Sequence, residues 1–395
     1  MIRVAATRAL TATLFLVLAT TAGADQHAPP AWGRTDDSPA GIGRYTFEVT
    51  NWPVDGRLAV PRGFPEIVRG TVDVDGNRQD LVVEYDADTT SVALVAAEAA
   101  RPAAVAVDTA DETRQFDDGR IVLTARTATV NGTHAKLEEH PANHRIGFWS
   151  DASDSVSWTQ KLTRWGAYDV RLTYSTASPS GTEIEVGLGD AKLAGRLEST
   201  GSWYRYATIP LGRVAIPAAG DLPVTVRCTK LVGAAVMNLK AITLTPACEG
   251  TPPVQAVDGT VTLHGRDATV RGTMLRWEPA EKKQTLGFWT RRTDAAEWTF
   301  TVRTPGTFDV EVLQGCGTGQ GGSEMAIEID EAQPTSSRVA FTVEDTGGFQ
   351  AFRQRTVGRV TIGETGDHTL RVQPKTIAKA AACDIRQIQL VPVTQ

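Results

Sequence analysis

The sequence of 395 residues has little of what marks several classes of protein. Four cysteines are too few to frame the fold of a chain this long. The net charge is −6 and there is no run of basic residues, which argues against a nucleic-acid partner. The sequence has no G-x-S-x-G motif, no Cys-His dyad and no phosphate-binding loop. We therefore expect a protein that is not an enzyme.

The cysteines allow at most one plausible bridge. Cys228 and Cys248 end the two strands of a predicted hairpin, but a turn near Gly233 leaves Cys248 on the order of 30 Å beyond Cys228. A disulfide needs Cα atoms within about 7 Å of each other. Cys316 and Cys383 are better placed, and the sequence leaves open whether they form a disulfide.

Long apolar runs are equally scarce. The run from Ala9 to Ala19 follows two arginines and precedes Ala22-Gly23-Ala24, which predicts a secretory signal peptide over residues 1–24. A membrane anchor is the alternative, but the run is short for a bilayer span. We expect a secreted or periplasmic protein with no membrane span, in which residues 25–44 form a leader segment.

A repeat organises most of the chain. "LTARTATVNGT" (123–133) matches "LHGRDATVRGT" (263–273), and "IGFWSDASDSVSWTQ" (146–160) matches "LGFWTRRTDAAEWTF" (286–300), at a constant spacing of 140 residues. A period this long indicates duplicated domains. The predicted domains are residues 119–247 and 259–395, joined by a linker over residues 248–258.

Hydrophobic alternation indicates strands throughout. Trp298, Phe300 and Val302 alternate with polar residues, a Pro-Gly turn follows, and the alternation resumes at Phe308. We therefore predict an all-β protein of three antiparallel β-sandwich modules in tandem: a small one over residues 45–118 and two duplicated jelly rolls. Trp158 and Trp298 are predicted core residues.

The segment "YTFEVTNWPVDGRLAVP" (45–61), with "WGRT" before it and a second hairpin about residues 75–77, resembles the C-terminal β-sandwich of bacterial α-L-fucosidases. In that family the catalytic carboxylates lie in a (β/α)₈ barrel, which this chain lacks. No residue can be assigned by resemblance to the two carboxyl groups that a retaining glycosidase needs.

The two repeats resemble galactose-binding-like carbohydrate modules, especially those of family six. The resemblance rests on "GFW…D…W", on "STGSWYRYATIPLGRV" (199–214) and on a closing strand that opens with Asn, "NLKAITLTP" (238–246). In such modules a sugar ring lies between two aromatic faces and is oriented by an amide. The resemblance implies carbohydrate-binding residues in repeat one (Phe148 or Trp149, Trp203, Asn238) and in repeat two (Phe288 or Trp289, Phe349, Asp384).

No metal or cofactor is expected. Family-six modules often hold calcium through an early Glu-x-Glu, but the matching positions here are Thr124-Ala125-Arg126 and His264-Gly265-Arg266. His134, His140 and His144 lie within eleven residues, and we expect this histidine cluster to be a surface loop and not a metal site. The recurring pairs Asp154/Asp294 and Asp169/Asp309 are predicted to cap turns.

Three functions follow from these features. The leading hypothesis is a secreted, non-catalytic carbohydrate-binding or accessory protein in the degradation of fucose- or galactose-containing polysaccharide. Its expected partners are a glycan and a separately encoded glycosidase or sulfatase. The first alternative is part of an α-L-fucosidase-type hydrolase whose barrel is separate or lost. The second is a surface adhesion protein that binds protein ligands.

Overall fold

The computed structural model describes residues 44–49, 56–60, 67–74, 77–85, 92–95, 103–109, 115–139, 144–330 and 336–393. The described residues form antiparallel β-sheets and two short 3₁₀ turns, with no α-helix, which confirms the all-β class. No helix within these ranges is long and apolar enough to cross a membrane. The predicted signal peptide, residues 25–43 of the predicted leader, and the Trp52-Pro53 pair of the first predicted hairpin lie outside the described residues.

The N-terminal segment forms one sheet with the strand order β1-β6-β3-β4-β5-β2. Strands β3 and β4 pair from Gly70↔Leu81 to Val74↔Asn77, as the predicted hairpin requires. Val72, Leu81 and Val105 are buried in it. The strands are β1 (Arg44–Val49), β2 (Arg57–Val60), β3 (Ile67–Val74), β4 (Asn77–Tyr85), β5 (Val92–Val95) and β6 (Ala103–Thr109).

Each repeat forms two facing sheets, and we call the repeats module one and module two. In module one the sheets have the orders β15-β12-β17-β10-β9, with β7 on β17, and β14-β13-β16-β11-β8. The elements are β7 (Ile121–Thr124), η1 (Ala125–Thr127), β8 (Thr129–Asn131), β9 (Lys136–Glu138), β10 (Arg145–Gly147), β11 (Ser155–Leu162), β12 (Gly166–Thr176), β13 (Thr182–Leu188), β14 (Ala191–Leu197), β15 (Ser202–Ile216), β16 (Gly220–Lys230) and β17 (Asn238–Pro246).

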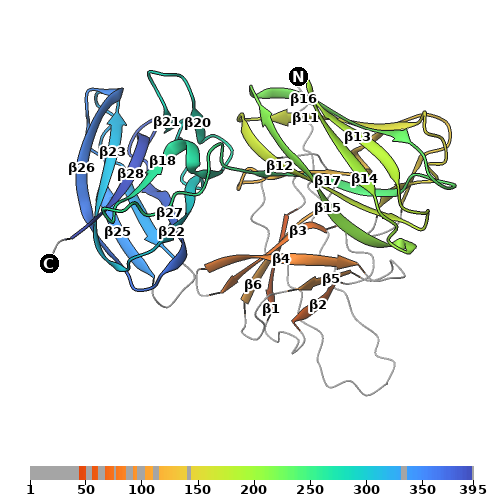
Figure 1. The fold of residues 1–395 in the computed structure, drawn as a ribbon, viewed down its shortest axis with the longest axis horizontal. Helices are drawn as coiled ribbons and strands as arrows, with labels where there is room; N and C mark the ends of the chain where they lie inside the picture. The colour runs from red at the N-terminus through yellow and green to blue at the C-terminus, as the bar shows by residue number, and fades with distance from the viewer. Residues whose placement is uncertain are drawn as a thin grey trace, which may run out of the picture.

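Module two repeats this topology strand for strand (Figure 1). Its sheets have the orders β20-β21-β28-β23-β26, with β18 on β28, and β19-β22-β27-β24-β25. The elements are β18 (Val261–His264), η2 (Gly265–Asp267), β19 (Thr269–Arg271), β20 (Arg276–Glu278), β21 (Thr285–Gly287), β22 (Ala295–Val302), β23 (Gly306–Cys316), β24 (Glu324–Ile329), β25 (Ser337–Thr342), β26 (Gly348–Ile362), β27 (Gly366–Thr376) and β28 (Asp384–Pro392).

The alternating residues of the central strands fill the core between the two sheets of each module. Trp158 and Trp298 are 4% and 0% exposed, so their predicted core role is confirmed. Each indole Nε1 donates to a backbone carbonyl, of Thr124 at 2.9 Å and of His264 at 2.7 Å. This bond satisfies the polar atom of each tryptophan inside the apolar core.

A shared turn explains the repeated Gly-Thr. Asp154 accepts hydrogen bonds from the backbone N–H groups of residues 133, 134 and 135, at 3.0, 2.9 and 2.6 Å. Asp294 does the same for residues 273–275. A Cβ on Gly132 would lie 1.9 Å from Asp154 Oδ1, so only glycine fits there. Each aspartate therefore organises a turn distant in sequence, not one beside itself.

The turn after β11 joins the two modules, and we call residues 163–165 the strap. Thr163 Oγ1 donates to the carbonyl of Thr273 at 2.5 Å, and Trp165 Nε1 donates to that of Trp277 at 3.3 Å. Arg164, which is 2% exposed, donates from Nε to the Gly272 carbonyl at 2.9 Å. A second bond from Arg164 reaches the Val270 carbonyl at 3.3 Å.

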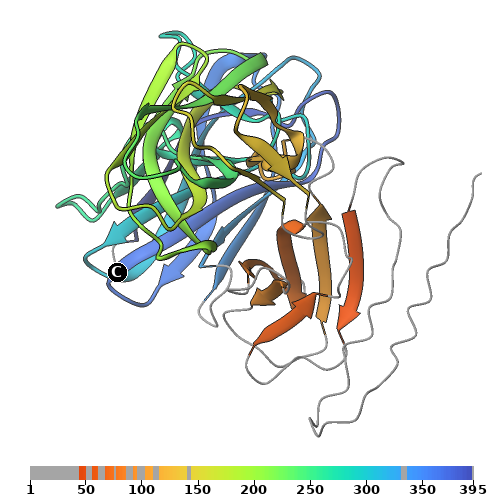
Figure 2. The ribbon, with the colours of Figure 1, turned by 90° about the vertical axis from the view of Figure 1, so that its right-hand side faces the viewer.

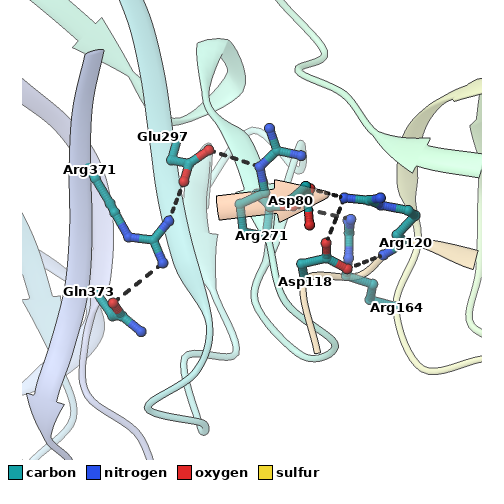
Figure 3. Close-up of polar contacts among 9 residues, drawn as sticks. Asp80, Asp118, Arg120, Arg164, Arg271, Glu297, Arg371 and Gln373 are labelled. Carbon is teal, nitrogen blue, oxygen red and sulfur yellow. Dashed lines mark hydrogen bonds and ion pairs between the residues drawn. The ribbon is translucent and has the colours of Figure 1, made fainter. Parts of the chain in front are cut away.

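Charged side chains surround the strap where the three parts of the chain meet (Figure 3). Arg120 pairs with Asp118 of its own module at 3.2 Å and with Asp80 of β4 at 2.6 Å. In module two Glu297 pairs with Arg271 at 2.8 Å and also with Arg371. The N-terminal sheet consequently lies beside module one, as Figures 1 and 2 both show.

We predict that Arg164→Ala uncouples the unfolding of the two modules. The substitution leaves the carbonyls of Val270 and Gly272 without donors, at a cost of about 2–4 kcal/mol. Differential scanning calorimetry of the full chain should show separated transitions. Arg303→Ala is the control, because Arg303 is exposed in the matching turn of module two. A variant that melts like wild type would show that the strap does not couple the modules.

Candidate functional site

Gly147 lies at one end of module one, where β10 ends, and we call Gly147 with its neighbours Glu138 and Asn238 the cradle. A Cβ on Gly147 would lie 1.8 Å from Glu138 Oε1 and 2.9 Å from Asn238 Oδ1. The carboxylate of Glu138 therefore occupies the place that a side chain at residue 147 would take, and the amide oxygen of Asn238 lies beside it. Among the described residues, Oδ1 of Asn238 receives no hydrogen bond, while its Nδ2 donates to the carbonyl of Trp203 at 2.7 Å.

The turn after the cradle exposes phenylalanine and buries tryptophan. Phe148 has φ +54° and Phe288 has φ +63°, the left-handed region that a bulky residue rarely adopts. Phe148 is 59% exposed, whereas Trp149 and Trp289 are fully buried. The sequence left open which member of each Phe-Trp pair reaches the surface. In both modules it is the phenylalanine.

Tyr204 and Arg145 also border this region, and sequence reasoning missed both. Tyr204 is 45% exposed, and the Arg145 guanidinium lies 5.1 Å from its ring centroid. Arg145 Nη2 pairs with Glu138 at 2.8 Å. Lys136, on the same strand as Glu138, places Nζ 4.1 Å from the Phe148 ring. Alternation along β15 could have indicated that Tyr204 faces solvent. The odd-numbered residues Ala207, Ile209 and Leu211 pack against the core, so even-numbered residues of the strand face the other side.

Trp203 and Asn238 support each other more than they face outward. Trp203 is half-buried, and Asn238 is only 6% exposed. The Trp203 carbonyl accepts hydrogen bonds from Asn238 and from Ser175 Oγ, the latter at 2.6 Å. The predicted amide thus fixes the start of β15 and offers only Oδ1 to a ligand.

The equivalent region of module two is covered by module one. The Arg276 guanidinium lies 3.4 Å from the ring centroid of Phe288 and 3.8 Å from that of Trp165 in the strap. Trp165 and Phe288 meet edge to face, with centroids 5.9 Å apart. Phe288 keeps 40% exposure, and Phe349 is half-buried. Lys136 holds the place of Arg276 beside Phe148, so the contact that only Phe288 makes is the one with Trp165 of the strap.

Asp384 replaces the amide of module one with a buried acid. It is 5% exposed, and its carboxyl makes no hydrogen bond among the described residues. Across Gly287 lies Glu278, which pairs with Lys283 at 2.6 Å. Burial and the charge of Glu278, opposed by Lys283, raise the pKa of Asp384 to about 7. The carboxyl is therefore partly protonated at neutral pH.

Two further predictions, on the histidine cluster and on Asp169, were not met. The predicted surface position is wrong for His144, which is 6% exposed, and His140 lies outside the described residues. His134, Asp151 and Asp154 lie within 4.8 Å of one another, a grouping that the histidine cluster did not suggest. Both Asp154 oxygens already accept backbone N–H groups, which explains the aspartate without an ion. Asp169 was expected to cap a turn, and this was wrong. It lies within β12 and pairs with Arg213 at 2.7 Å, as Asp309 pairs with Arg359 at 2.6 Å.

No cysteine is bonded to another in the structure. Cys316 ends β23, whose register pairs Gly315 with Asp384, so Cys383 is its neighbour across the strands. Both are fully buried. Cys228 and Cys248 are also unpaired, as the distance argument required.

Comparisons with known proteins give similarity in fold only. No protein-family model matches the chain, and no curated protein matches it. A family 35 carbohydrate-binding module from Clostridium thermocellum is 12% identical, with 32% of this chain covering 96% of that one and a TM-score of 0.28. The C-terminal CBM6 of LamC from Zobellia galactanivorans is 17% identical, with 32% of this chain covering 98% of that one and a TM-score of 0.26. A Paenibacillus xanthan lyase is 13% identical over 90% of this chain and 34% of its own, with a TM-score of 0.31. Similarity this low assigns no family.

We predict that Asp384 makes stability fall as pH rises. The folded-state pKa of about 7 exceeds the ordinary 3.8, so the folded protein binds the proton more tightly than the unfolded chain. Stability should decrease between about pH 4 and pH 7 and then level off, with a total change of a few kcal/mol. Denaturant unfolding of wild type and Asp384→Asn at pH 5 and pH 8 tests this.

Asn238→Asp provides the matched control in module one, where it should introduce a pH dependence of the same sign. Equal pH dependence in wild type and Asp384→Asn would contradict the prediction.

Proposed function

We propose that the protein is an exported, non-catalytic carbohydrate-binding protein, an accessory to polysaccharide degradation, with its glycan site in module one. The position of the exposed aromatic side chains carries this proposal. Among the described residues three aromatic side chains are exposed, Phe148, Tyr204 and Phe288. All three belong to the equivalent ends of the two repeats. Exposed aromatics gathered at one place mark a binding surface.

The chemistry around Phe148 and Tyr204 suits a sugar ring. Axial C–H groups of a pyranose pack against an aromatic plane, and hydroxyl groups need a few polar partners. Glu138 accepts hydrogen bonds, Asn238 Oδ1 accepts them, and Arg145 donates them. The two acceptors lie next to each other at Gly147, within the same end of module one.

The finer assignment rests on the sequence. Fucose- or galactose-containing polysaccharide is proposed because residues 45–61 resemble fucosidase tails and the repeats resemble galactose-binding-like modules. A separately encoded glycosidase or sulfatase is the proposed partner. Export is proposed from the signal-peptide pattern of residues 1–24.

The neighbouring carboxyl groups of Glu278 and Asp384 are the one observation that favours the enzyme alternative. An acid with a pKa near 7 beside a carboxylate is a familiar arrangement in hydrolases. Both side chains are less than a tenth exposed, however, and Phe288 beside them is covered by Arg276 and Trp165. That environment gives a polymer poor access, so we favour binding over catalysis.

We predict that Phe148→Ala and Tyr204→Ala each weaken retention on immobilised galactan or fucan about tenfold. The loss of one stacking partner is worth on the order of 1 kcal/mol. Affinity electrophoresis of the full chain measures the effect. The thermal midpoint should not change, because both side chains are exposed.

Phe288→Ala is the matched control and should leave retention nearly unchanged, since Trp165 of module one and Arg276 already lie against this ring. The proposal fails if wild type binds no polysaccharide. It also fails if Phe288→Ala abolishes retention while Phe148→Ala does not.

We also predict no turnover. Purified protein should release no nitrophenol from aryl fucosides or aryl sulfates between pH 4 and pH 8. Release that Asp384→Asn or Glu278→Gln abolishes would establish the enzyme alternative.

A further inference from the structure

The outer face of one sheet of module one carries a line of solvent-facing polar side chains. On β12, Asp169, Arg171 and Thr173 alternate with core residues, and on β15 Tyr204, Tyr206 and Thr208 do the same. Strands β12 and β15 pair from Asp169↔Arg213 to Tyr174↔Ala207, and the register is irregular before the next pair, Thr176↔Ser202. The paired residues 169–174 span about 17 Å of strand. The paired outer face therefore carries Arg171, while Tyr204 lies beyond the irregularity.

A hollow of about 670 Å³ lies at the far end of this surface. Its lining includes Arg120, Asp169, Arg171, Arg213 and Thr245. Arg213 is fixed by two bonds to Asp169, at 2.7 and 3.1 Å, and Arg120 is paired with acids. Arg171 is exposed, and its side chain has no partner among the described residues. Within the part of the chain that the structure describes, the Arg171 guanidinium thus lies in the hollow without an ion pair.

Arg145 lies beside Tyr204, at the end of module one opposite to the hollow. It is 7% exposed, and its Nη2 pairs with Glu138. Its Nε and Nη1 are buried, and the side chains of Tyr204 and Tyr206 lie beside the guanidinium. Arg145 therefore supports the side chains around it and presents little of its own surface to solvent.

Module two shows that the fold does not require these cations. At the spacing of 140 residues, Arg120, Arg145 and Arg171 correspond to Thr260, Thr285 and Glu311. The pair Asp169–Arg213 is retained there as Asp309–Arg359. Glu311 instead accepts a hydrogen bond from Gln354. Two sheets of the same topology thus differ in charge on the same face.

We propose that this face of module one binds a sugar chain bearing oxyanions, carboxylate or sulfate, at the hollow that Arg171 lines. This deepens the proposed function and rests on it. The planar fork of a guanidinium matches both oxyanions bidentately. Because the whole chain has a net charge of −6, long-range attraction does not favour polyanions, and binding depends on this local face.

The test compares three probes on the full chain by biolayer interferometry: polygalacturonate for carboxylate, dextran sulfate for sulfate, and neutral dextran. Arg171→Glu, which installs the residue of module two, should weaken binding of the charged polymer about tenfold. Raising the salt concentration should weaken it too. The charged probe that wild type prefers identifies the oxyanion.

Lys161→Glu is the matched control, since Lys161 is exposed on β11 of the opposite sheet. Equal losses from Arg171→Glu and Lys161→Glu would overturn the proposal, as would equal binding of charged and neutral polymers. Binding of galactan or fucan that depends on Phe148 but not on Arg171 would leave the proposed function standing alone. Absence of binding to every polymer would overturn both.

Discussion

The left-handed backbone at Phe148 and Phe288 decides which side chain of each Gly-Phe-Trp stretch reaches the surface. A φ of +54° or +63° is strained for a bulky residue and persists only where surrounding bonds hold it. Those bonds are present in both modules. The carbonyl of Trp149 accepts from Val236 N at 2.7 Å, and that of Trp289 accepts from Ala382 N at 2.8 Å. The buried tryptophans anchor the turn and the phenylalanines stand outside it.

Duplication gave two such turns, but the strap makes them unequal. Trp165 belongs to module one and lies against Arg276 and Phe288 of module two. The surface that is open around Phe148 is thus an intramolecular contact around Phe288. With that surface covered, the amide of Asn238 could be replaced by the acid Asp384. The cost of burying that acid is reduced by keeping it protonated, with its pKa near 7.

The sequence predicted those features that depend on local pattern. Alternating apolar residues identified the strands and the core role of Trp158 and Trp298, and the constant spacing identified the duplication. It could not choose between Phe148 and Trp149, because the positive φ depends on distant backbone bonds. It missed Tyr204 and Arg145 because their proximity to Glu138 arises only when β9, β10 and β15 share one sheet. It misjudged Asp169, whose partner Arg213 is 44 residues away.

Charge shows how far the two modules have diverged on one topology. A sheet face needs alternation to bury its inner side, but its outer side is constrained only by solvent and by neighbouring strands. Asp169–Arg213 and Asp309–Arg359 are cross-strand pairs that neutralise themselves, and both modules keep them. Arg171 lies beside the first pair with no acid opposite, whereas Glu311 beside the second is bonded to Gln354. An unneutralised cation adds nothing to sheet pairing. Its place in a hollow of module one leaves it accessible to the oxyanion that we propose binds there.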